Sequence, residues 1–280
     1  MTFLTDPKLL ENHSDFLSDE SEKIVALDPD YFNWSFSKDN IAVLKNVKAI
    51  CLATTSFSWV DVQAASQLGI PVTNLRGFST EAVAEYTLLM TLSVARKMPL
   101  VVKDNYKQDF VRHQGVELRG KTAAIIGLGR IGERIAKLME SIGMNVVYWS
   151  KSEKENRFKK IELVDLFKTA DVIFPTLAQN QETENLITDE MLMSMKPEAI
   201  FVSIVHKVYN HDLLLKLVKE SKIFGYAFEG DNENPLKYEG NVFASPAIAW
   251  ATKESMESNG IMWTDSILAA ANNEFPTRIN

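Results

Sequence analysis

The stretch that decides the fold is Lys121–Gly132, which reads KTAAIIGLGRIG. Its apolar part, Thr122–Ile126, predicts a buried strand, and the pattern that follows predicts a helix over Ile131–Ile142. Three glycines spaced as GxGxxG fill the turn between strand and helix. This position makes the match specific for a dinucleotide-binding turn.

Each glycine of this turn has a physical reason. Gly127 permits the tight turn, Gly129 lets the backbone approach a pyrophosphate, and Gly132 allows close contact between helix and strand. Arg130 and Ile131 open the helix, whose first amide groups face the anion. We therefore expect all five residues at the cofactor.

The end of the next strand, Asn145–Trp149, reads the 2′ position of such a cofactor. Proteins that bind NAD place a carboxylate there, whereas this chain has Ser150, Lys151 and Ser152 directly after Trp149. Hydroxyl groups and a cation can bind a 2′-phosphate that a carboxylate would repel. The run therefore favours NADP(H) over NAD(H). The alternative is that Lys151 is a solvated loop residue and that either cofactor binds.

Composition limits the classes of function. The chain has 280 residues, 46% hydrophobic and 24% charged, and it has no apolar run long enough to span a membrane. Its net charge of −7, without a basic block, argues against nucleic acid, so we expect a small-molecule substrate. The polar N-terminus has no apolar signal segment, which predicts a cytoplasmic protein. The single cysteine, Cys51, lies in an apolar run and is expected in the core.

Apolar runs alternate with helical patterns, which predicts an α/β fold with parallel sheets and crossover helices. The expected strands are Lys23–Leu27, Lys48–Ala53, Pro71–Asn74, Thr122–Ile126, Asn145–Trp149, Val172–Phe174, Ala199–Ile204, Phe224–Phe228 and Val242–Ala244. The expected helices are Asn40–Leu44, Trp59–Leu68, Ser79–Arg96, Ile131–Ile142, Leu163–Thr169, Thr188–Ser194, His211–Ser221 and Glu254–Ala271. Met98-Pro99 breaks the pattern, and a second domain is expected to start after it.

Several further motifs occur in a fixed order. They are Thr73-Asn74, GFSTEAVAE (77–85), LRGK (118–121), Glu182-Thr183, Met195-Lys196-Pro197 and PAIAWAT (246–252). With these motifs the chain resembles, over nearly its whole length, the D-2-hydroxyacid dehydrogenases, near the glyoxylate/hydroxypyruvate reductases and glycerate dehydrogenases. The resemblance implies two Rossmann-like domains: a flavodoxin-like substrate domain of residues 1–96 and 254–280, and an inserted NAD(P)-binding domain of residues 97–253. It also implies hydride transfer between a nicotinamide and a 2-hydroxy or 2-oxo carbon.

This chain has other residues where the family carries its catalytic groups. The Arg that grips the substrate aligns with His206, with Lys207 as its competitor, and neither has a guanidinium fork. The acid/base His aligns with Ala247, and its carboxylate partner aligns with Asn234, next to Glu233. The resemblance therefore implies a nicotinamide site beside a rewired set of catalytic residues.

The same alignment implies further site residues. The substrate loop reads TTSFSW (54–59) instead of a glycine-rich turn, so Thr55, Ser56 and Phe57 are expected at the substrate, together with Trp250. Glu229 takes the place of an Asp that meets the nicotinamide carboxamide, with the reacting centre as an alternative. The remaining expected cofactor contacts are Thr87, Leu177 and Ile204, and Ser58 and Tyr209 are also expected to face the cleft.

Two functions stay open at this point. The first is an NADPH-dependent reductase of a small carbonyl compound, and the second is a non-catalytic dinucleotide-binding sensor or scaffold. Intact glycines beside a lost Arg–Glu–His set are typical of the second. A third interpretation, an engineered inactive variant, accounts for Ala247 but not for Asn234 and the replaced Arg together. The apolar helix Ala82–Val94 and the segment Met98–Phe110 predict a homodimer in either case.

Overall fold

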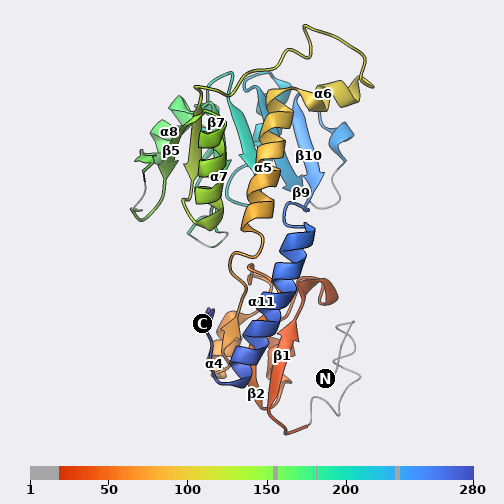
Figure 1. The fold of residues 1–280 in the computed structure, drawn as a ribbon, viewed down its shortest axis with the longest axis vertical. Helices are drawn as coiled ribbons and strands as arrows, with labels where there is room; N and C mark the ends of the chain where they lie inside the picture. Colours follow the sequence, from red (N-terminus) through yellow and green to blue (C-terminus); the bar gives the residue numbers. More distant parts are fainter. Residues whose placement is uncertain (1–18, 154–156, 179, 181, 231–233) are drawn as a thin grey trace. The chain divides into compact units, whose positions relative to one another are not determined.

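The computed structural model describes residues 19–153, 157–178, 180, 182–230 and 234–280. The chain divides into two compact units, Met1–Ser79 with Lys253–Asn280, and Thr80–Thr252 (Figure 1). The division falls between Ser79 and Thr80, before the boundary expected after residue 96. The reason is that helix α5 (Thr80–Ala95) packs against a helix and strands of the central unit, so it belongs to that unit.

The unit built from both chain ends contains a three-stranded parallel sheet. Its order is β1-β2-β3, formed by Lys23–Leu27, Val47–Leu52 and Val72–Thr73. The other elements among the described residues of this unit are η1 (Pro29–Tyr31), α3 (Lys38–Ala42), α4 (Val62–Gln67) and α11 (Lys253–Ala271), the last of which packs on β1 and β2. Cys51 is fully buried in β2, and its Sγ lies 3.8 Å from the Ser266 carbonyl oxygen on α11. Burial raises the pKa of this thiol, and the expected core position is confirmed.

The central unit contains a seven-stranded, wholly parallel sheet. Its order is β10-β9-β8-β7-β4-β5-β6, formed by Val242–Pro246, Gly225–Gly230, Ile200–Ser203, Val172–Pro175, Thr122–Ile126, Asn145–Trp149 and Lys159–Lys160. The chain leaves β4 for β5 on one side and later returns to β7 on the other, so the strand order reverses at β4. Open parallel sheets bind ligands at the carboxyl ends of the strands beside such a reversal.

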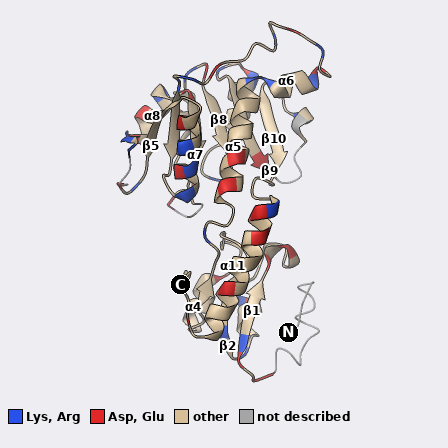
Figure 2. Ribbon diagram, viewed as in Figure 1, with Lys and Arg blue, Asp and Glu red and all other residues tan. Residues whose placement is uncertain are grey.

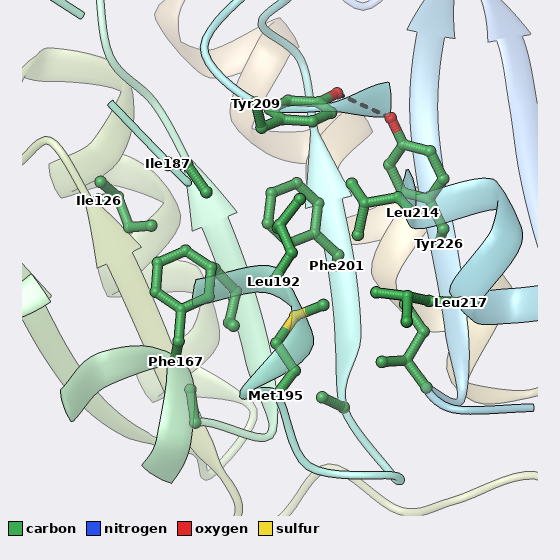
Figure 3. Close-up of a cluster of buried hydrophobic side chains, with 14 of the residues drawn as sticks. Ile126, Phe167, Ile187, Leu192, Met195, Phe201, Tyr209, Leu214, Leu217 and Tyr226 are labelled. Atoms are coloured by element: carbon green, nitrogen blue, oxygen red, sulfur yellow. Dashed lines mark hydrogen bonds between the residues drawn. The ribbon is translucent and has the colours of Figure 1, made fainter. Parts of the chain in front are cut away.

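Helices cover both faces of this sheet. On one face, α5 and α7 (Arg130–Ser141) form a core with the strands, while α8 (Leu163–Thr169), α9 (Asp189–Met193) and α10 (His211–Lys219) do so on the other. Figure 3 shows part of the second core. Consecutive strand residues alternate between the cores: Ile125 packs with α7, and Ile126 packs with α8. The layers confirm the predicted α/β class with a Rossmann domain.

The segment after α5 contains a helix that the sequence did not predict. Helix α6 spans Met98–Lys103, with Pro99 in its first turn. Its last residue, Lys103, donates to the carbonyl oxygens of Tyr238 at 2.6 Å and Gly240 at 2.9 Å. These bonds tie α6 to the segment after η2 (Pro235–Lys237) within the central unit.

Charges of both signs are interspersed on the described elements, as Figure 2 shows for α7. On that helix Lys137 pairs with Glu133 at 2.6 Å. Among the described helices, none combines the length and apolar character that crossing a bilayer requires. The described residues also contain no group of three or more His, Cys, Asp or Glu side chains able to hold a metal ion.

Candidate functional site

The glycine turn follows β4 directly. Gly127 has a φ of +99°, a region that favours glycine, and its amide donates to the Trp149 carbonyl oxygen at 2.8 Å. A Cβ on Gly132 would lie 2.2 Å from the Gly127 carbonyl oxygen, so a larger residue does not fit there. A Cβ on Gly129 would meet nothing within 4 Å. The middle glycine therefore faces open space, as an approach to phosphate requires.

The first amide groups of α7 have no side-chain cap. Gly129 is the N-cap residue, and as a glycine it has no side chain that could cap the amides that follow it. Gly129 and Arg130 are exposed, Ile131 is half-buried, and Leu128 is buried. Uncapped amides and the helix dipole stabilise an anion at such an end. The turn thus has the groups that would hold a pyrophosphate.

Two residues that follow β7 support the turn. Thr176 donates its hydroxyl to the Gly127 carbonyl oxygen at 2.6 Å and its amide to the Ile126 carbonyl oxygen at 2.8 Å. The Leu177 side chain would lie 3.0 Å from a Cβ on Gly127. Leu177 was expected at the cofactor, but Thr176 was missed. Its position directly after a buried strand, at the strand-order reversal, is the signal that would have found it.

The end of β5 presents the residues expected at the 2′ position. Ser150 is buried, Trp149 is half-buried against the core, and Lys151 and Ser152 are exposed. The Lys151 Nζ lies 2.8 Å from the Glu182 Oε2. The hydrogen bond and charge of Lys151 lower the pKa of the Glu182 carboxyl. A dinucleotide phosphate that uses Lys151 must therefore compete with Glu182.

His206 and Lys207 lie exposed in the loop after β8, with Ile204 half-buried before them. Lys207 has a φ of +59°, a left-handed conformation that is uncommon for a residue with a side chain. Its carbonyl oxygen accepts from the Asn185 amide at 3.4 Å. Because the sheet is parallel, this loop follows the same edge of the sheet as the glycine turn. The two basic side chains and the glycine turn therefore both follow the carboxyl ends of strands in this sheet.

Glu229 lies at the carboxyl end of β9 and is only 6% exposed. Its Oε1 accepts from the Ala249 amide at 2.6 Å, and burial raises the pKa of this carboxyl. Ala247, directly after β10, is exposed. Glu229 therefore holds the backbone of the loop that carries Ala247, a contact that the alignment did not reveal.

Asn234 is exposed, and its side-chain oxygen accepts from the Leu236 amide at 3.0 Å as the N-cap of η2. The side-chain oxygen of Asn234 is therefore engaged in a local hydrogen bond. The neighbouring Glu233 lies outside the described residues. Trp250, after β10, is 40% exposed.

The expected substrate loop lies in the other unit, after β2. Thr55, Ser56 and Phe57 are exposed, as is Ser58. The loop is ordered by its own hydrogen bonds, since the Trp59 Nε1 donates to the Ser56 carbonyl oxygen at 2.9 Å. The nearly buried Asn74 donates to the Thr55 carbonyl oxygen at 2.7 Å. Asn74 was noted only as part of a motif, and its anchoring role was missed.

Like Ser150 and Glu229, two further residues expected at the site are buried. Thr87 is 1% exposed on α5, and its hydroxyl donates to the Val83 carbonyl oxygen at 2.7 Å. Tyr209, expected to face the cleft, is 7% exposed and belongs to the core of α8, α9 and α10. Its ring packs edge-on against Phe201, with centroids 5.0 Å apart, and its hydroxyl pairs with Tyr226 at 2.8 Å. The aromatic side chain is better accommodated by this core than by solvent.

Comparison with known proteins agrees with the geometry of the central unit. A family model described as D-isomer specific 2-hydroxyacid dehydrogenase, NAD binding domain, matches residues 88–251. The glyoxylate reductase of Aeropyrum pernix is 31% identical over 264 residues, which cover 86% of this chain and 78% of the relative. The D-3-phosphoglycerate dehydrogenase of Archaeoglobus fulgidus is 32% identical over 246 residues, 82% of this chain and 46% of the relative.

The fold is shared with solved structures of low sequence identity. An acyclic imino acid reductase in complex with NADPH and D-Arg superposes with a TM-score of 0.85 at 23% identity, covering 98% of this chain and 88% of that one. The TT0316 protein of Thermus thermophilus superposes with a TM-score of 0.84 at 24% identity, covering 100% and 91%. These similarities extend over both units.

Proposed function

The chain belongs to the D-isomer specific 2-hydroxyacid dehydrogenase family of NAD(P)-dependent oxidoreductases, and on that basis we propose that it is an NADP(H)-dependent reductase of a small, 2-oxoacid-like carbonyl compound with an atypical active site. The observation that carries the proposal is the exposed pair His206 and Lys207 at the sheet edge that also bears the glycine turn. Ala247, by contrast, offers no proton donor at the position of the family's histidine.

The cofactor side of the proposal rests on groups that fit a dinucleotide. The uncapped amides after Gly129 suit a pyrophosphate. Leu177 lies against the turn, and Ile204 is a half-buried apolar residue on the sheet edge. Lys151, with the hydroxyls of Ser150 and Ser152 beside it, suits the additional phosphate of NADP(H). These features support NADP(H) over NAD(H).

The chemistry then divides between cofactor and protein. A bound reduced nicotinamide supplies the hydride that adds to the carbonyl carbon. The developing alkoxide oxygen takes a proton from His206 or Lys207, whose positive charge also attracts the substrate carboxylate. Proton and hydride together convert the carbonyl group to an alcohol. Neither side chain reproduces the bidentate fork of an arginine, so we expect weaker orientation of simple 2-oxoacids.

Substrate selection in this proposal falls to the loop after β2. Its exposed hydroxyls and the 44% exposed ring of Phe57 replace the glycine-rich turn that the family has there. We expect these larger, partly polar side chains to leave less room for a substrate than glycines would. This supports a carbonyl compound that differs from glyoxylate or pyruvate.

A second function, a dinucleotide-binding sensor without catalysis, is favoured by one observation. Ala247 removes the family's acid/base group, and Asn234 uses its side-chain oxygen to cap η2. Both functions share the cofactor site, so binding alone does not separate them. Turnover does.

We also propose a cytoplasmic homodimer. The exposed apolar residues of α5, α6 and the segment after them support the dimer, namely Leu89, Leu92, Met98, Val102, Tyr106, Phe110 and Val111. Phe110 and Val111 are 82% and 86% exposed, and an exposed apolar patch is a common mark of a protein interface.

The experiment that tests the function is NADPH oxidation by the purified chain against a panel of 2-oxoacids, aldehydes, ketones and imino acids. Turnover of any member supports the reductase. Tight NADPH binding without turnover of any member supports the sensor.

A further inference from the structure

We propose that Arg76 binds the carboxylate group of the substrate, and that it supplies after β3 the guanidinium that this chain does not have after β8. The inference rests on the proposed function, because it names a further contact for the same 2-oxoacid-like substrate. Arg76 lies in the segment after β3, in the unit built from both chain ends. Its side chain is exposed.

The distribution of charge at the small sheet singles out Arg76. The three strands are parallel, so the segments that follow them, 28–37, 53–61 and 74–79, leave the same edge of the sheet. Arg76 is the only Lys, Arg or His in these segments. The other charged side chains there are Asp28, Asp30 and Asp61. An anionic group that binds at this edge therefore has one cation within these segments to pair with.

Hydrogen bonds join the segment of Arg76 to the loop after β2. The Asn74 side chain, only 3% exposed, donates to the Thr55 carbonyl oxygen at 2.7 Å. The Leu75 amide donates to the Thr54 carbonyl oxygen at 3.0 Å. The Arg76 Nε in turn donates to the Asn74 Oδ1 at 3.3 Å. One buried amide side chain thus connects the guanidinium to the loop that we propose selects the substrate.

The guanidinium of Arg76 retains donors for a ligand. Besides the bond from Nε, its Nη2 donates to the Arg278 carbonyl oxygen at 3.5 Å, which uses one proton. A guanidinium has five N–H groups, so three of them make no hydrogen bond with the described part of the chain. Arg112 and Arg134, by contrast, each pair with a carboxylate. Two N–H groups in one plane match the two oxygens of a carboxylate.

This assignment divides the substrate between two sets of residues. The proton donor remains His206 or Lys207, whose charge attracts the carboxylate but whose side chain has no fork. Arg76 adds the fork, which binds a carboxylate in one orientation. A carbonyl compound with a carboxylate beside the carbonyl carbon is therefore favoured over a neutral aldehyde or ketone.

Binding of oxamate, an unreactive analogue of a 2-oxoacid, tests the assignment without turnover. The full-length chain is loaded with NADPH and titrated with oxamate in a calorimeter. Arg76→Gln raises the Kd of oxamate about thirtyfold, because charge-assisted hydrogen bonds are lost. Arg76→Lys raises it less, since it keeps the charge without the fork. Arg278→Gln removes another exposed arginine side chain of the same unit, and this matched control keeps the Kd within twofold of the native value.

Four outcomes of the titration overturn the assignment. They are a Kd within twofold of native in Arg76→Gln, an equal loss in Arg278→Gln, a larger loss in Lys207→Ala, and no binding of oxamate to the native chain. The second outcome reflects net charge alone, and the third places the carboxylate at the loop after β8. If Arg76→Gln does not unfold cooperatively on heating, Arg76→Lys decides, and a Kd within twofold of native then overturns the need for the fork.

Kinetics separate the carboxylate from the rest of the substrate. Arg76→Gln raises the KM of a 2-oxoacid about thirtyfold and changes the KM of its methyl ester less than threefold, because the ester has no anionic group. Equal changes for acid and ester overturn the role of Arg76. Absence of turnover in the native chain refutes the proposed reductase, while the oxamate titration still decides whether Arg76 binds a carboxylate.

Discussion

The Lys151 Nζ and the Glu182 Oε2 lie 2.8 Å apart, so the cation expected to read the 2′ position of the cofactor already has an acidic partner. Both side chains are mostly exposed, at 78% and 71%. Exposed ion pairs of this kind are weak and screened by salt. A phosphate with nearly two negative charges can therefore displace Glu182.

This competition predicts that NADPH binds more tightly than NADH. Lys151→Ala weakens NADPH about tenfold through the loss of a charge-assisted bond and leaves NADH within twofold. Glu182→Gln, which removes the competitor, tightens NADPH. Calorimetric titration of both cofactors checks these values, and equal or tighter binding of NADH by the native chain refutes the preference.

The exposed apolar surface of α6 and the segment after it predicts a homodimer. Phe110→Glu places a charge where the proposed interface buries a ring, so it shifts the protein to the monomer at micromolar concentration. Val43→Glu, at an exposed apolar residue of the other unit, is the control and leaves the dimer intact. Light scattering measures the mass of each. A native chain that is monomeric across micromolar concentrations contradicts the prediction.

Much of the fold was predictable from the sequence because apolar periodicity and cap residues act locally. The start of helix α4 was predicted less well. The helix begins at Val62 and not at the expected Trp59, because Asp61 caps it by accepting from the Ala64 amide at 2.9 Å. Met98-Pro99 was interpreted as a break, yet proline is well tolerated in a first helical turn, and α6 starts there. The two-residue strand β6 is too short and too charged to leave a pattern.

Because Lys207 has a left-handed backbone, Lys207→Gly is expected to affect folding stability and turnover differently. A residue with a side chain in this conformation costs roughly 1–2 kcal/mol relative to the right-handed form, whereas glycine adopts it freely but loses more entropy on folding. We therefore expect Lys207→Gly to raise the free energy of unfolding, by at most about 1 kcal/mol. It still lowers turnover. Urea unfolding checks stability, and a loss of more than about 1 kcal/mol contradicts the account of this turn.

Glu229 makes folding stability depend on pH. Burial raises the pKa of this carboxyl in the folded state above its value in the unfolded chain. Between the two values the folded state binds more protons, so stability falls as pH rises through the folded pKa and is fully present below the unfolded one. Glu229→Gln lacks this slope. The difference in unfolding free energy between native and variant should fall as pH rises from below the unfolded-state pKa through the raised folded-state pKa, and a flat difference would contradict the burial effect.

The candidate site was predictable only in part. The glycines and the strand ends could be placed because spacing alone identifies them. The burial of Tyr209 could not be predicted, since nothing local shows that its ring packs on Phe201 of β8 and that its hydroxyl meets Tyr226 of β9. The bond from Glu229 to the Ala249 amide likewise joins residues distant in sequence and depends on the pairing of β9 with β10.

The central claim is that any proton donor comes from the loop after β8 and not from position 247. Its most direct test is the rate of NADPH oxidation on the best carbonyl substrate, compared among the native chain, His206→Ala, Lys207→Ala and Ala247→His. General acid catalysis contributes about 10²–10⁴-fold, so we expect one of the two alanine variants to lose a factor of this size. Native turnover should fall as pH rises, because the donor must be protonated, and rates on glyoxylate and pyruvate should be low. Rates on 2-oxoacids that equal those of the family's glyoxylate reductases and survive both alanine substitutions would contradict the claim.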